Sequence, residues 1–277
     1  MPQVGNDEED LTRKERREQA RAQRKAVEEA EAARAVRRTR MTQLGIVVAI
    51  VVVAIVVIAV AAGGGGSSNH TVQKGSAREA STVSKVNAEI GGISQRGNVL
   101  GAATAPVTLV YFGDLECPVC REFTLTALPS LIQKYVRTGK LRVEYRSLET
   151  ATREPETFKT QQIAALAAGA QNVMWNFIEL FYNEQGQEDS GYVTEGYLSN
   201  LANQTTGLNK AKWEEDRHNP AYENAVTTDA QLANSNKFNG TPAFLIGRTG
   251  GKLQKLEEVS PSEASGFESA IESLLKK

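Results

Sequence analysis

The chain has 277 residues, a formal net charge of -1 and a hydrophobic fraction of 40%. It is long enough for a sizeable domain with its own core, and the balanced charge argues against a polyanion-binding surface, so nucleic acid is not an expected partner. The two cysteines, Cys117 and Cys120, are too few for a disulfide scaffold or a four-ligand zinc site. Their close spacing leaves redox chemistry as the leading use.

An uncharged apolar run from Leu44 to Ala62 predicts a single transmembrane helix, because roughly 20 apolar residues are needed to cross a bilayer core. Segment 34–40 carries four arginines just before the run, whereas the first cations after it are Lys74 and Arg78. This asymmetry predicts a cytoplasmic N-terminus. The expected protein is a single-pass protein of the cell membrane whose folded domain lies outside the cytoplasm, where disulfides persist.

A cleaved signal peptide is the alternative interpretation of this run, because residues 59–61 read Ala-Val-Ala and fit a small-residue cleavage pattern. The length of the apolar run and the more than forty residues that precede it favour a retained anchor. Both interpretations place the folded part outside the cytoplasm.

The segments on either side of the predicted span do not have the composition of folded domains. Residues 1–43 are dense in Glu, Arg, Lys and Ala, which predicts a solvated, charged helical arm in the cytoplasm. Residues 63–88 begin with four glycines and two serines, which is typical of a flexible tether. The globular domain is therefore expected over residues 89–277, opening on a short edge strand near Gly91 and Gly92.

The first part of this domain predicts a strand, a helix and a second strand. Residues 106–112 are rich in β-branched and aromatic side chains and predict a buried central strand. From Cys117 onward the apolar residues recur at helical spacing, with a kink expected at Pro129. Residues 140–146 alternate like a further strand, so the segment reads as a βαβ unit.

Residues 155–236 predict a helical insertion, with interruptions at 186–191 and 205–207. Aromatic residues within it fall at helical spacing, which favours the core over a peptide-binding groove. These are Trp175, Phe177, Phe181 and Tyr182.

The C-terminal part predicts a hairpin and a last helix. Residues 241–247 are expected to form a strand, residues 249–251 a turn and residues 252–256 a pairing strand. A final helix is expected over residues 262–275.

The Cys117-Pro118-Val119-Cys120 motif carries the expected chemistry. Thiol–disulfide exchange needs an attacking thiolate and a second thiol that resolves the mixed disulfide. A helix N-terminus at Cys117 would stabilise its thiolate, so Cys117 is the predicted nucleophile and Cys120 the resolving thiol. Pro118 fits the first turn, where its missing N–H costs no hydrogen bond. An inert disulfide or two reduced core thiols are the alternatives.

Two acidic residues, Asp114 and Glu116, stand just before Cys117, and a like charge there would oppose thiolate formation. A solvated loop is the alternative for both residues and the favoured interpretation of Glu116. Neither His70 nor His218 has the neighbours of a metal site or protease triad. No metal and no bound cofactor are expected beyond the redox-active Cys117–Cys120 disulfide itself.

Three stretches that lead into the motif, 99–101, 105–110 and 114–120, resemble the DsbA-like thioredoxin family, and residues 239–244 match its second signature. The resemblance covers about residues 90–277. It implies an α/β thioredoxin fold with an inserted helical subdomain, here preceded by a transmembrane helix. It also implies that Pro242 follows a cis peptide bond beside the cysteines, and that the Thr241 backbone binds an extended substrate segment.

The resemblance implies a thiol:disulfide oxidoreductase that introduces disulfides into exported proteins and is regenerated by a DsbB-like or vitamin K epoxide reductase-like membrane partner. The sequence departs from the best-known oxidant of the family at Val119, where that protein has histidine, and so lacks one source of thiolate stabilisation. A reductase or isomerase acting through the same site is an alternative. A tethered thioredoxin-fold binding module without redox activity is another.

Overall fold

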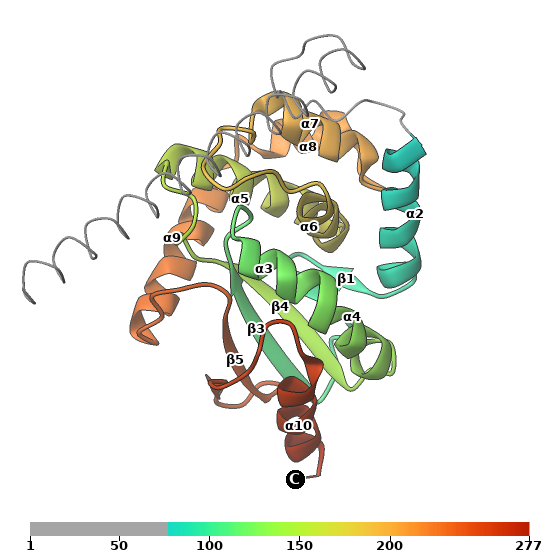
Figure 1. Ribbon diagram of the computed structural model, residues 1–277, viewed down its shortest axis with the longest axis vertical. Coiled ribbons are helices and arrows are strands. Elements are labelled where there is room, and N and C mark those ends of the chain that lie inside the picture. Colours follow the sequence, from blue (N-terminus) through green and yellow to red (C-terminus); the bar gives the residue numbers. More distant parts are fainter. Residues whose placement is uncertain (1–76, 277) are drawn as a thin grey trace, which may run out of the picture. The chain divides into compact units, whose positions relative to one another are not determined.

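The computed structural model describes residues 77–276. Figure 1 shows a central sheet with helices α5–α8 grouped on one side of the molecule and α10 at the opposite end. No helix within these residues is long and apolar enough to cross a membrane. The predicted arm at 1–43, the predicted span at 44–62 and most of the predicted tether lie outside the described residues.

The domain begins earlier than predicted, because helix α2 spans Ala77–Ile90 where the sequence predicts the end of the tether. Val86 and Ile90 lie one turn apart and are buried in the core. The Arg137 guanidinium donates hydrogen bonds to three main-chain carbonyls around the C-terminal end of α2. Although the segment is mostly polar, it has a narrow apolar stripe, and packing of that stripe against the core stabilises the helix.

Six strands form one sheet in the order β1-β2-β4-β3-β5-β6. The predicted edge strand at Gly91–Gly92 is a turn, and the first strands are β1 (Gln95–Arg96) and β2 (Val99–Leu100). At the centre, β3 (Val107–Gly113) is buried along its whole length and runs parallel to β4 (Leu141–Ser147), which confirms the predicted βαβ unit.

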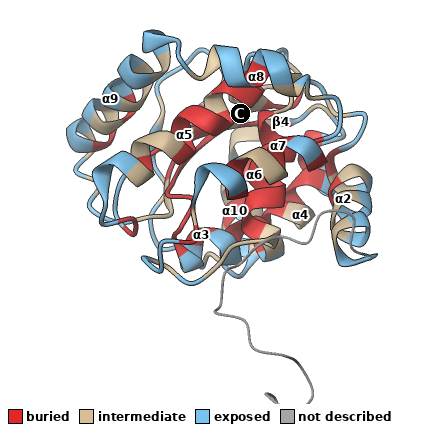
Figure 2. Ribbon diagram, turned by 90° about the horizontal axis from the view of Figure 1, so that it is seen from above, coloured by how far each residue is buried: buried red, intermediate tan, exposed pale blue. Residues whose placement is uncertain are grey.

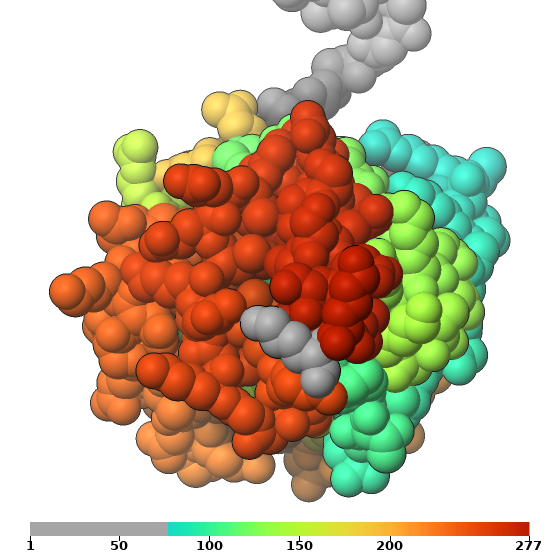
Figure 3. Space-filling model, turned by 90° about the horizontal axis from the view of Figure 1, so that it is seen from below, coloured from blue at the N-terminus to red at the C-terminus, as the bar shows by residue number. Residues whose placement is uncertain are grey.

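The other strand pairs of this sheet are antiparallel. Strand β5 (Ala243–Arg248) pairs with β3, and β6 (Gln254–Lys255) pairs with β5 at the edge. The predicted hairpin is confirmed, although its second strand is shorter than expected. Helix α10 (Ala264–Leu275) follows. In Figure 3, the C-terminal residues, coloured orange to red, make up most of the face seen from below.

A continuous helical stretch connects β3 to β4. It consists of α3 (Pro118–Glu122), the π-helical turn η1 (Phe123–Ala127), α4 (Leu128–Leu131) and a second π-helical turn, η2 (Ile132–Val136). Pro129, the expected kink, lies two positions after the end of η1, in the first turn of α4. The Leu128 N–H donates to the Phe123 carbonyl, five positions back. The helix therefore deviates from α-helical geometry in a widened turn just before the proline.

The helical insertion is confirmed. It contains α5 (Pro155–Gly169), α6 (Met174–Asn183), α7 (Glu195–Gln204), α8 (Lys210–Asp216) and α9 (Pro220–Ser235). Figure 2 shows buried residues, in red, along α5 and α6. The four aromatic residues assigned to the core, Trp175, Phe177, Phe181 and Tyr182, are all fully buried there.

Aromatic rings join the active-site helix to the sheet and to α10. Phe123 makes edge contacts with Tyr111 and with Phe244, at centroid distances of 4.9 and 4.7 Å. Phe244 in turn meets Phe267 of α10 at 4.9 Å. Because aromatic pairs add to the stability gained by burial, this cluster holds the base of the Cys117 helix rigidly against the central strands.

Candidate active site

The backbone brings Cys117 to the start of α3 by ending the buried strand β3 four residues earlier. Cys117 is the N-cap of the helix, and its sulfur accepts the backbone N–H of Cys120 at 3.3 Å. Pro118 occupies the first turn, as predicted. Both cysteines are reduced and buried, Cys120 completely, whereas Val119 between them is 42% exposed.

The two sulfurs differ sharply in acidity. Hydrogen bonds from Cys120, Thr241 and the backbone at the helix start lower the pKa of Cys117 to about 6, against the opposing effect of burial. Burial, followed by the interaction with the Cys117 sulfur, raises the pKa of Cys120 well above its ordinary value. A reactive thiolate beside a protonated partner is the pair that disulfide exchange requires.

The loop before β5 closes the site from the other side. The peptide bond between Thr241 and Pro242 is cis, in agreement with the resemblance. The Cys117 thiol donates to the Thr241 carbonyl at 3.5 Å, across 124 positions of sequence. Cys117, Cys120 and Thr241 are therefore brought together, with Pro242 next along the chain.

The Asp114 carboxylate is fully buried beneath this site, and its charge is satisfied by donors. Five donors surround it at 2.6–3.1 Å, namely the N–H groups of Glu116, Thr150, Ala151 and Thr152 and the Thr152 hydroxyl. The carboxylate thus fixes the loop that follows β4 to the turn that precedes Cys117. The sequence indicated only the charge of Asp114, whereas the structure shows that its carboxylate holds two loops together.

Comparison with known proteins agrees with this geometry. The sequence matches the family described as thioredoxin over residues 94–262, which is more than half of the chain. The chain belongs to the thioredoxin family.

The most informative relatives of this thioredoxin-family chain are DsbA-like. It is 28% identical over 153 residues to the probable disulfide bond formation protein D of Bacillus anthracis, a match that covers 53% of this chain and 68% of that protein. The crystal structure of oxidised BdbD from Bacillus subtilis superposes with a TM-score of 0.56 and 21% identity, covering 67% of this chain and 98% of that one.

Wolbachia pipientis alpha-DsbA1 shares the fold as well, with a TM-score of 0.54, 18% identity and coverage of 65% of this chain and 90% of that one. These similarities and the geometry of the cysteine pair identify a DsbA-like thiol:disulfide oxidoreductase.

Glu116 of this thioredoxin-family protein does not lie in the predicted solvated loop, because it is only 2% exposed. The turn stabilised by Asp114 directs its side chain inward, where Thr152 and the Asp189 backbone hydrogen bond to it. Burial outweighs these hydrogen bonds and raises the pKa of Glu116 to about 7. The expectation failed because loop polarity alone does not reveal which side chains a neighbouring loop covers.

Sequence reasoning also missed the residues that hold the cysteine turn from the helical insertion. The Gln185 amide donates to the carbonyls of Leu115 and Cys117 at 2.7 and 3.2 Å. The Tyr182 hydroxyl donates to the Asp114 carbonyl at 3.1 Å. Nothing in the sequence marks these contacts, because they join segments about seventy positions apart in the chain.

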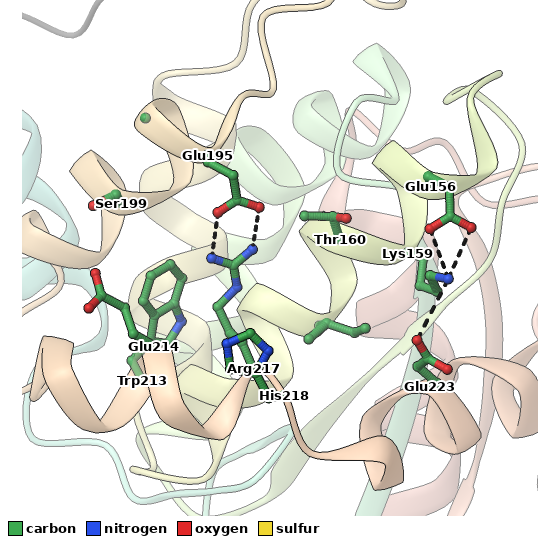
Figure 4. Close-up of a pocket in the computed structure, with 12 residues that line it drawn as sticks. Glu156, Lys159, Thr160, Glu195, Ser199, Trp213, Glu214, Arg217, His218 and Glu223 are labelled. Carbon is green, nitrogen blue, oxygen red and sulfur yellow. Dashed lines mark hydrogen bonds and ion pairs between the residues drawn. The ribbon is translucent and has the colours of Figure 1, made fainter.

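A separate hollow of about 680 Å³ lies among the helices of the insertion (Figure 4). Its charges are already paired: Arg217 forms two hydrogen bonds with Glu195, and Lys159 contacts Glu156 and Glu223. Because two glutamates share Lys159 and Glu214 also lines the hollow, its carboxylates outnumber its cations. Among residues 77–276, no three His, Cys, Asp or Glu side chains come together as a metal site.

Proposed function

We propose that the protein introduces disulfides into exported proteins through its Cys117–Cys120 pair, acting outside the cytoplasm from an anchor at residues 44–62. The observation that carries the proposal is the split in acidity between the two thiols. A stabilised Cys117 thiolate stabilises the reduced enzyme, and a dithiol that is stable when reduced makes its disulfide a stronger oxidant.

The reaction transfers two electrons from a substrate dithiol to the enzyme disulfide. A substrate thiolate attacks the Cys117 sulfur, the Cys117–Cys120 bond breaks, and Cys120 leaves and takes up a proton. The second substrate thiolate then attacks the substrate sulfur of the mixed disulfide, which forms the product disulfide and releases the Cys117 thiolate. The low pKa of Cys117 makes it a good leaving group in this last step.

The described surface suggests how a substrate would dock. Val119 is the exposed large hydrophobic side chain within residues 77–276 and stands between the cysteines. The Thr241 carbonyl faces the Cys117 sulfur, so an extended substrate segment that pairs with the Thr241 backbone would place its cysteine at the same sulfur. We infer that Pro118, Val119, Thr241 and Pro242 form the substrate-contacting rim.

The released dithiol must be reoxidised for turnover. We propose a membrane oxidase of the DsbB-like or vitamin K epoxide reductase-like kind, because the predicted anchor would keep the domain at the membrane surface. Protease added to intact spheroplasts should digest the domain if it lies outside. Complete protection would contradict the proposed topology.

The deciding experiment is the equilibrium reduction potential of the full chain in glutathione buffers, read from the Cys117–Cys120 disulfide. An oxidase is expected nearer the DsbA value of about -120 mV than the thioredoxin value of about -270 mV. A potential at the thioredoxin end would instead favour the alternative function, a reductase supplied with electrons from the membrane.

Trapping provides the complementary test. In cells, Cys120→Ser is expected to accumulate mixed disulfides, formed when the Cys117 thiolate attacks a disulfide of an exported protein, because no Cys120 thiol remains to displace the substrate. Cys117→Ser should form none. Full retention of cellular function by Cys117→Ser would favour the tethered binding module and exclude the proposed enzyme.

A further inference from the structure

The loop between β4 and α5 contacts the active site through a side chain that has no part in the exchange reaction described above. The Thr150 hydroxyl lies within hydrogen-bond distance of the Thr241 hydroxyl, 91 positions away in sequence. Thr241 is also the residue whose carbonyl faces the Cys117 sulfur. A side chain from a different loop therefore reaches the residue whose carbonyl contacts the Cys117 sulfur.

Thr150 is held in this place by its backbone. Its N–H donates to the Asp114 carboxylate at 3.1 Å, and the next two residues, Ala151 and Thr152, donate to the same oxygen at 2.9 Å. The Thr150 side chain itself is free of this anchor. The loop would therefore keep its course if the hydroxyl were removed, which makes the hydroxyl separable from the fold.

A hydroxyl group has one hydrogen to donate and two acceptor positions. If the Thr241 hydroxyl receives a hydrogen from Thr150, its own hydrogen remains available for the Cys117 sulfur. Thr241 already lies at this sulfur through its carbonyl, and a side-chain hydrogen bond from Thr241 is among the causes that lower the pKa of Cys117. Hydrogen bonds in such a chain polarise and strengthen one another.

We propose that Thr150 is a positioning residue of the exchange site, whose hydroxyl donates to the Thr241 hydroxyl and thereby directs the Thr241 hydrogen to the Cys117 sulfur. The inference deepens the proposed function and depends on it. In this arrangement the β4–α5 loop helps to lower the pKa of Cys117. Asp114 acts on Cys117 indirectly, because it holds that loop in place.

The opposite direction of the contact makes an opposite prediction. If Thr241 donated to Thr150, the Thr241 hydrogen would be occupied, and removing the Thr150 hydroxyl would release it toward Cys117. The pKa of Cys117 would then fall instead of rise. The sign of the change therefore distinguishes the two arrangements.

The test is a pH titration of the Cys117 thiolate by its ultraviolet absorbance in the full chain, for wild type, Thr150→Val and Thr150→Ser. Valine keeps the shape of threonine and removes the hydroxyl. We expect the pKa of Cys117 to rise by about half a unit, because the hydrogen bond from Thr241 to the thiolate is weakened but not lost. Serine should restore the wild-type value. The exposed Thr227, whose hydroxyl bonds within its own helix, supplies the matched control Thr227→Val.

A double variant isolates the route. In a Thr241→Val background, Thr150→Val should not change the pKa of Cys117 further, because the Thr241 hydroxyl that links Thr150 to Cys117 is already absent. An unchanged or lowered pKa in Thr150→Val, or a rise that persists in the Thr241→Val background, would overturn the inference. A wild-type Cys117 pKa near the ordinary value of about 8.5 would instead refute the proposed function, so the two failures are distinguishable.

Discussion

Two fully buried carboxyl groups show opposite solutions to the same problem. Asp114, beneath the cysteines, receives five hydrogen bonds, four of them from main-chain N–H groups. Glu179, on α6 behind helix α2, has no hydrogen-bond partner on either oxygen within residues 77–276. A buried charge is tolerated where donors converge on it, and otherwise the acid is kept neutral.

The lack of donors around Glu179 is reflected in its pKa. Burial, followed by the nearby charge of Glu89, raises the pKa of Glu179 well above its ordinary value, while Lys85 opposes the change. Glu179 therefore stays protonated over a wider pH range than an exposed glutamate. The active-site end thus uses a buried carboxylate to organise loops, whereas at the α2–α6 contact a buried acid is tolerated because burial suppresses its charge.

Removing Asp114 should have the largest effect on stability. Asp114→Ala leaves the N–H groups of Glu116, Ala151 and Thr152 buried without acceptors, and we expect a loss of about 3–5 kcal/mol in the free energy of unfolding. Urea unfolding of the reduced protein measures it. Asp114→Asn, which keeps one carbonyl acceptor, should lose less, and equal losses would show that the charge and its donors contribute little.

Glu179 should give the opposite sign. Its pKa is raised in the folded state, so wild-type stability is fully present below the unfolded value of about 4.3 and falls as the pH rises above it. Glu179→Met fills similar volume without a charge and should stabilise the protein by about 1–3 kcal/mol at pH 8. Urea unfolding from pH 5 to pH 8 tests it, with the exposed Glu215→Gln as control.

If Glu179→Met instead destabilised the protein equally at every pH, the side chain would contribute by packing alone. The contrast with Asp114 would then be one of shape and not of charge.

Glu116 lies between these extremes, because it is buried but has hydrogen-bond partners. Its pKa of about 7 exceeds the unfolded value, so it costs stability as the pH rises from about 4.3 through 7. Glu116→Gln should remove that slope and gain about 2–3 kcal/mol at pH 8 relative to pH 5, because the pKa lies about two units above pH 5 and each unit corresponds to about 1.4 kcal/mol. Parallel stability–pH curves for wild type and variant would exclude a buried, titrating Glu116.

Much of the fold was predictable because its signals are local. The continuous apolar run of β3, the alternation of β4 and the helical spacing of α6 each reflect one element packed on one core. Helix α2 was missed because its composition is polar and only a few side chains meet α6 and the core. Its formation depends on a docking surface that lies far away in sequence.

The sequence by itself determined the reactive pair, since Cys117 before Pro118 specifies a helix start whose unpaired N–H groups stabilise a thiolate. It also predicted the main strands and helices from β3 onward, because their periodicities lie in neighbouring residues. Only the tertiary structure decided what surrounds the sulfur: the Thr241 loop, the Thr150 hydroxyl and the donors to Asp114. The physical reason is that hydrogen bonds and burial depend on which distant segments meet, and local propensity does not encode that.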